Sequence, residues 1–341
     1  MSTRRYRRAW PVRGLAALLI ASLTLASCGV ATTPALKATG LPATSINIAL
    51  QASACSASHC FAVGATMTPL PTTATAVRLA KNGALAPLAT PAFTAGSFAS
   101  ASCMATVCYV AGTQDGHNVL WSFEPTTEQL STVNQAAILL PGSSTGITAL
   151  SCGPSNCGYI DATTSHVIRF VSYGTNGHQV QNVPLVTDEH VDALGCATDL
   201  RCVVAVSGGA SARVLRQSLL TSGWTVEPTP AKWSSVSAVS CVASCVYLAT
   251  VAGKSTIDWS TTKGWQTETV PFTANALACL PGQRCVVVGQ HTDGNGAAWW
   301  WHKGATRSVD LTYVPTALTS VGCGLTRCFA AGLTTAVELA P

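Results

Sequence analysis

The sequence predicts an all-β fold, a seven-bladed β-propeller, from three observations. Cysteines occur in seven couplets, and the first members of successive couplets lie 48, 49, 44, 45, 38 and 44 residues apart. A recurring period of this size indicates a repeat architecture. Each period holds four short β-prone runs bounded by glycine, proline, serine or threonine, and no stretch after residue 28 shows a sustained helical period. Four strands in each of seven repeats are typical of a propeller.

The first 28 residues read as an export signal. Five arginines fall within the first thirteen residues, and the apolar run 15–26 that follows is too short for a comfortable membrane span. The run ends in Leu25, Ala26, Ser27 and Cys28, which resembles the lipobox of bacterial lipoproteins. That resemblance implies a lipid on Cys28. The alternative is an ordinary signal peptide with an incidental cysteine, and both Sec and twin-arginine export stay open.

The chain after Cys28 is expected to form a short tether, residues 29–34, and then one propeller, residues 35–341. The seventh repeat stops after its third strand, whereas the segment 35–42 precedes the first repeat as a fourth strand does elsewhere. A blade without its outer strand would leave an exposed edge. We therefore predict that an N-terminal strand within 35–42 closes the ring. The alternative is that this segment belongs to a free tether.

Strand composition changes in the same way along each repeat. The first run consists of small and β-branched residues, as in Ala238, Val239 and Ser240, which suits the wall of a narrow central channel. The second run is almost continuously apolar, as in 285–288, which suits a strand covered on both faces. The third and fourth runs are more mixed. Polarity is therefore expected to rise from the centre outward.

The cysteines are expected to form one hairpin disulfide in each blade. The chain has fifteen cysteines, and lipidation of Cys28 leaves an even number. If the first member of a couplet ends one strand and the second begins the next, their antiparallel Cα separation of roughly 4.5–5.5 Å fits a disulfide. An exported, oxidised chain with few nearby histidines disfavours metal binding. The expected pairs are Cys55 and Cys60, Cys103 and Cys108, Cys152 and Cys157, Cys196 and Cys202, Cys241 and Cys245, Cys279 and Cys285, and Cys323 and Cys328.

Composition argues against several classes of function. Only 10% of the residues are charged, and the formal net charge of +5 is matched by the five arginines of the export signal. The remaining body is near neutrality, so no basic surface for nucleic acid is indicated. The sequence has no nucleophile elbow, phosphate-binding glycine loop or HExxH motif. We therefore expect no cofactor and no metal, and a monomer.

The repeat phrase carries a family likeness. The stretches "SVSAVSC…CVYLATVAG" and "GITALSC…CGYIDAT" resemble the Ser-Cys…Cys-Val-Ala-Val-Gly repeats of secreted propeller proteins from high-GC Gram-positive bacteria. The Gly-Trp turns at Gly223 and Gly264 are more distantly similar to the Asp-box, or BNR, turn of sialidase-like and photosystem-assembly-factor-like propellers, although the aspartate is missing. The likeness implies the fold for nearly all of the mature chain. It leaves activity open, because such families include enzymes, ligand binders and assembly factors.

Candidate ligand contacts are expected on the face opposite the cysteine hairpins, a choice taken from the architecture of propellers. The densest polar group there is the acidic cluster at the entry to blade four, whose carboxylates beside a histidine suit acid/base chemistry or a divalent cation. The alternative is a solvated loop. Two loops of turn-forming composition and two aromatic residues complete the candidates, which are Asp188, Glu189, His190, Asp192, Asp115, His117, His291, Asp293, Trp233 and Tyr313.

Two further groups have simpler interpretations. Arg201, Arg284 and Arg327 each precede the second cysteine of a couplet. This position would give the hairpin face a basic rim for a cell-wall polymer or a lipid head group. The alternative is that arginine occurs at this turn position by chance. In the run 299–301 of three tryptophans, at most the outer two share a face of a strand. We expect them to pack between blades and not to stack on carbohydrate.

These observations favour a non-enzymatic, lipid-anchored extracytoplasmic propeller at the cell membrane that binds a protein or a cell-wall glycan. The alternative is a glycan-active hydrolase of sialidase-like propeller type, with its carboxylates in the cluster 188–192. A third possibility is an assembly factor for another exported protein. The sequence does not name the partner.

Overall fold

The computed structural model is an all-β protein. It describes residues 37–40, 48–57, 59–67, 73–79, 85–88, 95–124, 129–132, 144–153, 156–163, 168–174, 177–197, 201–209, 211–217, 223–230, 232–302, 305–309, 314–333 and 335–340. The chain divides into a unit Met1–Ala35 and a compact unit Leu36–Pro341, and every described residue belongs to the second. The export signal, Cys28 and the tether 29–34 thus lie outside the described residues.

The described strands form seven antiparallel sheets of four strands each, numbered here one to seven in chain order. Sheets one to three contain β2 Ile48–Cys55, β3 Cys60–Thr66, β4 Ala74–Leu79 and β5 Leu85–Pro87; β6 Gly96–Cys103, β7 Cys108–Gln114, β8 His117–Glu124 and β9 Gln129–Thr132; and β10 Ser144–Cys152, β11 Asn156–Thr163, β12 Ile168–Gly174 and β13 Gly177–Asn182.

Sheets four to six follow the same order, first strand to fourth. They contain β14 His190–Cys196, β15 Cys202–Gly208, β16 Ser211–Gln217 and β17 Trp224–Glu227; β18 Trp233–Cys241, β19 Cys245–Val251, β20 Lys254–Thr261 and β21 Gly264–Thr269; and β22 Thr273–Leu280, β23 Arg284–Gln290, β24 Gly296–His302 and β25 Ala305–Val309. Sheet seven contains β26 Leu318–Cys323, β27 Cys328–Gly332, β28 Ala336–Ala340 and, from the other end of the chain, β1 Lys37–Gly40.

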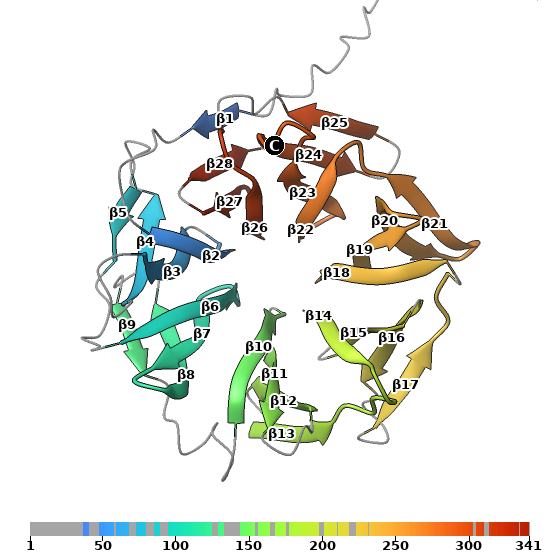
Figure 1. Cartoon of the computed structure of the whole chain (residues 1–341), viewed down its shortest axis with the longest axis horizontal. Coiled ribbons are helices and arrows are strands. Elements are labelled where there is room, and N and C mark those ends of the chain that lie inside the picture. Colours follow the sequence, from blue (N-terminus) through green and yellow to red (C-terminus); the bar gives the residue numbers. More distant parts are fainter. Residues whose placement is uncertain are drawn as a thin grey trace, which may run out of the picture. The chain divides into compact units, whose positions relative to one another are not determined.

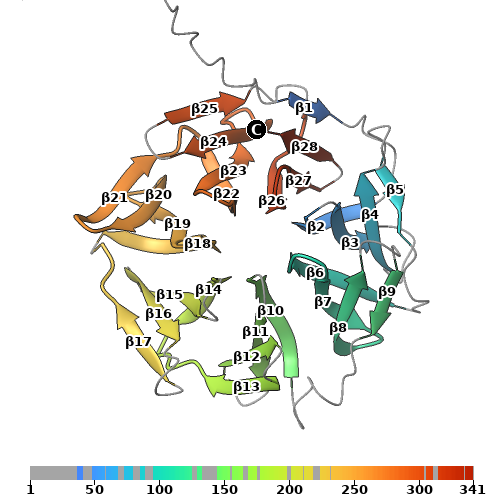
Figure 2. The same cartoon turned by 180° about the vertical axis from the view of Figure 1, so that it is seen from behind.

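The sheets follow one another around a common centre. The first strand of each sheet contacts the first strand of the next, from β2 through β6, β10, β14, β18 and β22 to β26, and β26 contacts β2 (Figure 1). The view from behind shows the same cyclic order (Figure 2). Two opposite faces result. We call the face where first and second strands are joined the hairpin face, and the face where the chain enters each first strand the entry face.

The fourth strand of sheet seven comes from the N-terminal side of the chain. β1 pairs with β28 in an antiparallel register that sets Lys37 opposite Ala340 and Gly40 opposite Val337. The strand therefore lies within the segment 35–42 in which the sequence predicts it. Pairing covers the outer edge of β28, which would otherwise present unpaired backbone groups.

Each couplet forms a disulfide between the end of a first strand and the start of a second. The seven pairs are those expected, with Cα separations of 3.9–4.0 Å, below the range expected for a general antiparallel pair. The hairpin pattern explains the short separation. The residue after the first cysteine donates its N–H to the carbonyl of the residue before the second, as between Ser56 and His59 at 2.8 Å. The cysteines themselves therefore form the closer, non-hydrogen-bonded pair.

Apolar side chains between neighbouring sheets form the core. In β24, Trp299 and Trp301 pack toward sheet five beside Trp259, while Trp300 packs toward sheet seven beside Leu318. All three tryptophans of β24 are buried, and the Nε1–H of Trp301 donates to Glu268 at 2.8 Å. The expected packing between blades is therefore what the structure shows. A carbohydrate platform would need these rings at the surface.

Candidate functional site

The acidic cluster lies on the entry face, in the turn that precedes β14. Asp188 holds a positive φ of 68°, and the N–H of Glu189 donates to the carbonyl of Val186 at 3.1 Å. The carboxylate of Glu189 reaches back and accepts the N–H of Val186 at 2.8 Å. Aspartate tolerates this left-handed conformation better than most residues. One acid of the cluster therefore shapes the turn, and another closes it.

Glu189 also forms an ion pair with Arg213, a half-buried residue of β16. The Nε and Nη2 groups of Arg213 each donate to one carboxylate oxygen at 2.7 Å, and Nη2 also donates to the carbonyl of Pro184 at 3.0 Å. The hydrogen bonds from Arg213 hold the pKa of Glu189 below its ordinary value, against the opposing effect of burial. A general acid needs a raised pKa, so this carboxyl group is poorly suited to that role.

His190, Asp192 and Ser207 come together in the same sheet. Nε2 of His190 lies 3.0 Å from Oδ1 of Asp192 and 3.2 Å from Oγ of the buried Ser207. In a serine hydrolase the serine and the carboxylate use different ring nitrogens, so that one can lose a proton while the other is held. Here both partners meet one nitrogen. The arrangement is therefore not a catalytic triad.

Asp192 extends this group to the neighbouring sheet. Its Oδ2 accepts the backbone N–H of Val236 in β18 at 3.5 Å, and its side chain is largely buried, whereas the side chain of His190 is 69% exposed. The carboxylate thus joins two sheets. Asp192 is one of the two acids that the hydrolase interpretation would need, and its contacts give it a structural role instead.

The two other polar loops of the entry face are tight turns. Asp115 has a positive φ of 50°, precedes Gly116 and accepts the N–H of Ala95 at 3.0 Å, with His117 exposed beside it at the start of β8. In the second loop, Oδ1 of Asp293 accepts the N–H of Asn295 at 3.0 Å. The φ of Asp115 and the bond between Asn295 and Asp293 are the turn chemistry expected of such sequences, whereas the bond from Ala95 ties the first turn to the entry of β6.

His291 belongs to the second of these loops and also contacts Phe272, the residue that precedes β22. Its N–H donates to the carbonyl of Asn295 at 2.9 Å, and its ring lies 5.9 Å from that of Phe272. The contacts named here tie the polar loops of sheets two and six to segments of the same repeat, whereas Asp192 of sheet four also bonds to β18 of sheet five. They share a face without forming one constellation.

The two aromatic candidates have different outcomes. Trp233 is 1% exposed and packs against Tyr247 and Trp265, with ring centroids 5.5 and 5.1 Å away. Its ring is therefore part of the core and does not present a surface to a ligand, because these aromatic neighbours from β19 and β21 cover it. Tyr313 lies outside the described residues.

A cavity of about 350 Å³ opens at the hairpin end of the first strands. Residues of all seven sheets line it, and they include the first cysteine of each couplet. The residue before that cysteine is always small, as in Ala54, Ser102 and Gly322, which leaves the space open. The described residues that line the cavity include no charged side chain, and they offer shape and hydroxyl groups but no acid or base. Sequence reasoning sought the ligand on the other face and missed this cavity.

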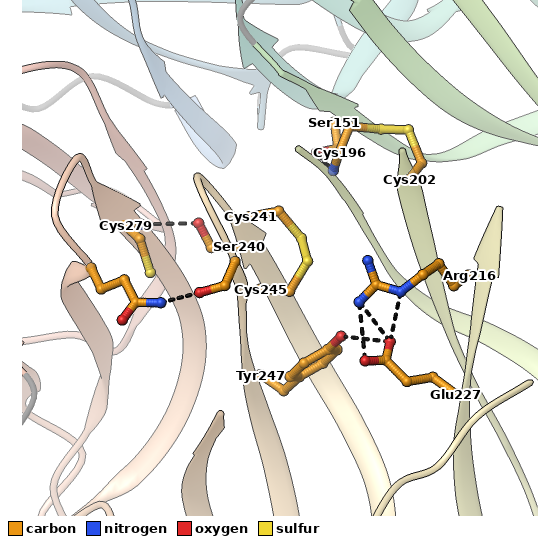
Figure 3. The surroundings of a disulfide bond; sticks show 12 residues. Ser151, Cys196, Cys202, Arg216, Glu227, Ser240, Cys241, Cys245, Tyr247 and Cys279 are labelled. Atoms are coloured by element: carbon orange, nitrogen blue, oxygen red, sulfur yellow. Dashed lines mark hydrogen bonds and ion pairs between the residues drawn. A yellow bond between two sulfur atoms is a disulfide. The ribbon is translucent and has the colours of Figure 1, made fainter. Parts of the chain in front are cut away.

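Polar contacts around the disulfides join neighbouring sheets (Figure 3). The N–H of Cys196 donates to Oγ of Ser151 at 3.1 Å, one example of a bond that crosses from one first strand to the next. Farther out, Arg216 donates to Glu227 at 2.8 Å, and the hydroxyl of Tyr247 in the next sheet donates to the same carboxylate at 3.4 Å. Burial raises the pKa of Tyr247. These groups stabilise the junction between sheets four and five.

The described residues contain no cluster of three or more histidine, cysteine or acidic side chains arranged to hold a metal ion. They also contain no helix with the length and apolar character needed to cross a membrane. The seven disulfides indicate an extracytoplasmic protein.

Comparison with known proteins shows the fold and no more. No family model and no curated protein matches the chain. Among solved structures, an inactive virginiamycin B lyase from Staphylococcus aureus with quinupristin is 10% identical, with a TM-score of 0.63 and coverage of 90% of this chain and 99% of that one. A structure of YCF48 bound to D1 peptide is 15% identical, with a TM-score of 0.59 and coverage of 91% and 96%. A chain of the mitotic checkpoint complex is 13% identical, with a TM-score of 0.62 and coverage of 100% and 99%. The chain therefore has a β-propeller type of fold.

Proposed function

We propose that this protein is a lipid-anchored extracytoplasmic β-propeller that acts as a binding or scaffold module for a protein or cell-wall partner. In this proposal the seven sheets are the blades, each carries one disulfide, and β1 closes the ring. The lipid is attached at Cys28, at the end of the lipobox-like sequence. The mature chain then consists of the tether 29–34 and the propeller.

The observation that carries the proposal is that both candidate carboxylates, Glu189 and Asp192, are engaged in contacts within the fold. Glu189 is held by two hydrogen bonds from Arg213, and Asp192 is shared between His190 and the backbone of Val236. Groups held in this way stabilise a rigid surface, whereas an acid catalyst needs a proton to donate near neutral pH. Binding is therefore the function that the geometry supports best.

A protein partner is our first choice. YCF48 shares this type of fold and is seen with a D1 peptide bound, which supports a role in which a propeller holds a peptide segment. Rigid propeller faces carry loops from several blades, which suits recognition of an extended surface. A cell-wall glycan is the second choice within the same proposal.

Crosslinked capture from membranes tests the binding role. The full-length protein and its Asp188→Asn variant would be expressed in the native host, crosslinked in intact cells and recovered. Asparagine keeps the left-handed turn and removes one exposed charge on the entry face. We expect one extracytoplasmic partner to be recovered with the wild type and less of it with the variant. An equal, unselective set of proteins from both would contradict the proposal.

Two measurements complete this test. The intact mass of the membrane-bound protein should begin at a lipidated Cys28, and Cys28→Ala should abolish that mass and membrane retention. Incubation with cell-wall glycans and aryl glycosides should give no turnover. Turnover that is abolished by both Glu189→Gln and Asp192→Asn would favour the hydrolase instead.

A further inference from the structure

The direction of β1 fixes where the chain enters the propeller. The first strand of each sheet runs toward the hairpin face, and β28, the third strand of sheet seven, runs in the same direction because strands alternate within the sheet. β1 is antiparallel to β28 and therefore runs away from the hairpin face. Lys37, the first residue of β1, thus lies at the hairpin-face end of sheet seven.

The tether is short compared with the height of the propeller. Eight residues, 29–36, separate Cys28 from Lys37. At about 3.3–3.6 Å per residue the fully extended segment reaches roughly 30 Å. If the entry face pointed at the membrane, Lys37 would be raised by about the length of an eight-residue strand, roughly 26 Å at 3.3 Å per residue. Nearly the whole tether would then be stretched, whereas the opposite orientation leaves it slack.

The two faces differ in charge. In the described connections of the hairpin face, Lys263 lies in the turn between β20 and β21, and Arg201, Arg284 and Arg327 lie at the cysteine hairpins. None of the described residues in these connections is acidic, although Arg327 pairs with Glu338 of β28 at 3.2 Å.

The entry face has the opposite character. Among the described residues, its turns expose Asp115, Asp188 and Asp293, and its exposed lysines are Lys232 and Lys254. Anionic lipid attracts basic groups close to its surface and repels acidic ones, within about 10 Å at ordinary salt. Charge therefore favours the same orientation as the tether.

Apolar side chains stand beside the cations of the hairpin face. Leu325, at the tip of the β26–β27 hairpin, is 55% exposed. Met104 and Val242 are half-buried at the tips of two other hairpins, where they border the cavity. Leu325, two residues from Arg327, suits the boundary between lipid head groups and acyl chains. Val186 and Leu333 are exposed in connections of the entry face, so charge and tether length, and not apolar exposure, distinguish the two faces.

We propose that the hairpin face rests on the anionic phospholipid surface in which the Cys28 lipid is anchored, and that the entry face points away from the membrane. This orientation rests on the lipid anchor of the proposed function. It assigns the two faces different partners. The hairpin face meets lipid head groups, and the entry face remains accessible to the extracytoplasmic partner.

Lysine acylation of the lipidated protein tests the orientation with native residues. The full-length mature protein would be placed in vesicles of phosphatidylcholine and phosphatidylglycerol, which lack primary amines that could be acylated, or kept in neutral detergent. Labelling at each lysine would be followed by mass spectrometry. We expect labelling of Lys263 to slow at least several-fold in vesicles, while the exposed Lys232 and Lys254 of the entry face are unchanged. Equal rates at all three sites, or protection of Lys232 and Lys254, would overturn the orientation.

Charge variants provide the matched control. Hydrogen exchange of the backbone amides in the cysteine hairpins measures how strongly vesicles protect the hairpin face. The double variant Lys263→Glu and Arg284→Glu should remove this protection, whereas the double variant Lys232→Glu and Lys254→Glu should keep it. Vesicles of phosphatidylcholine alone should protect less. Protection by a soluble anionic cell-wall polymer but not by anionic vesicles would overturn a lipid partner. A protein that fails to float with vesicles refutes the anchor itself, whereas a floating protein without protection refutes only the orientation.

Discussion

The hydroxyl of Ser240 accepts the backbone N–H of Cys279, in the next sheet, at 3.0 Å. The same bond joins Ser102 to Cys152 at 2.9 Å and Ser151 to Cys196 at 3.1 Å. Because the two cysteines of a couplet form a non-hydrogen-bonded pair, the N–H of the first cysteine points away from its own hairpin. A serine from the preceding sheet satisfies it. The recurrent Ser-Cys phrase is therefore a device that joins neighbouring sheets.

The first prediction removes this junction at one place. Ser240→Ala should lower the free energy of unfolding by about 1–3 kcal/mol, because a partly buried N–H loses its acceptor. The effect would be measured by urea unfolding of the oxidised protein. Ser234→Ala is the control, since its exposed hydroxyl donates within its own sheet, to the carbonyl of Thr250. A change of less than about 0.5 kcal/mol for both variants, as for ordinary surface substitutions, would contradict the role of the bond.

The serine bond shows what the sequence could reveal and what it could not. The spacing of the cysteine couplets, the even number of cysteines left after Cys28 and the four β-prone runs in each repeat identified the repeats and the cysteine pairs. Repeats and hairpin pairs can be predicted in this way because they depend on residues that are close in sequence. The partner of each serine lies about one repeat farther along the chain, as between Ser102 and Cys152. Finding it requires the arrangement of whole sheets. At the same position Ala54, Gly195, Ala278 and Gly322 replace serine, so the sequence of the couplet alone does not show that the serine joins neighbouring sheets.

A second prediction concerns the contact between sheets seven and one. A Cβ added at Gly322 would lie 2.4 Å from Cα of Ala54 and 2.6 Å from the carbonyl oxygen of Ser53. Gly322→Ala should therefore force β26 and β2 apart and destabilise the protein by about 1–3 kcal/mol. Gly146→Ala is the matched control, because its nearest neighbour, Oδ1 of Asn118, is 4.0 Å away. Thermal unfolding of both variants measures the difference, and equal midpoints would refute the tight contact.

A third prediction tests the pairing of β1 with β28. Neighbouring positions of an antiparallel strand alternate between hydrogen-bonded and non-hydrogen-bonded pairs, and proline removes the N–H. Of Ala38→Pro and Thr39→Pro, therefore, only one should remove a ladder bond, and it should lower the thermal midpoint more. Cleavage by proteinase K, which does not depend on lysine or arginine, should also be faster in that variant. If neither proline changes the midpoint or the cleavage rate, β1 does not stabilise the fold.

The candidate site was harder to predict than the fold. Sequence reasoning found the acids of the entry face but not Arg213, which reaches Glu189 from β16, 24 residues farther along the chain. It also placed Trp233 at the surface, whereas two aromatic neighbours bury it. Strand entrances in a propeller alternate between inward and outward side chains, and the bulge between Trp233 and Ser235 shifts that alternation locally. Local composition carries no signal for such a shift.

The last prediction concerns pH. Because hydrogen bonds from Arg213 lower the pKa of Glu189 in the folded state, ionised Glu189 stabilises the fold above its unfolded pKa of about 4.3. That stabilisation is lost as the pH falls through the lower, folded-state pKa. Glu189→Gln should therefore cost up to about 1 kcal/mol at neutral pH, as for a well-formed ion pair near the surface. The difference from wild type should shrink as the pH falls below about 4.3.

Urea unfolding at a series of pH values measures this difference. In an Arg213→Gln background the step from Glu189 to glutamine should lose most of its pH dependence, because the guanidinium that lowers the pKa is gone. The same cycle separates the two roles considered for Glu189. If Glu189 were an acid catalyst, its pKa would be raised, and the difference in unfolding free energy between wild type and Glu189→Gln would still change with pH above 4.3. If Glu189 is a turn-closing ion pair, that difference is already constant above pH 4.3. A pH dependence that persists without Arg213 would show that the ion pair is not its source.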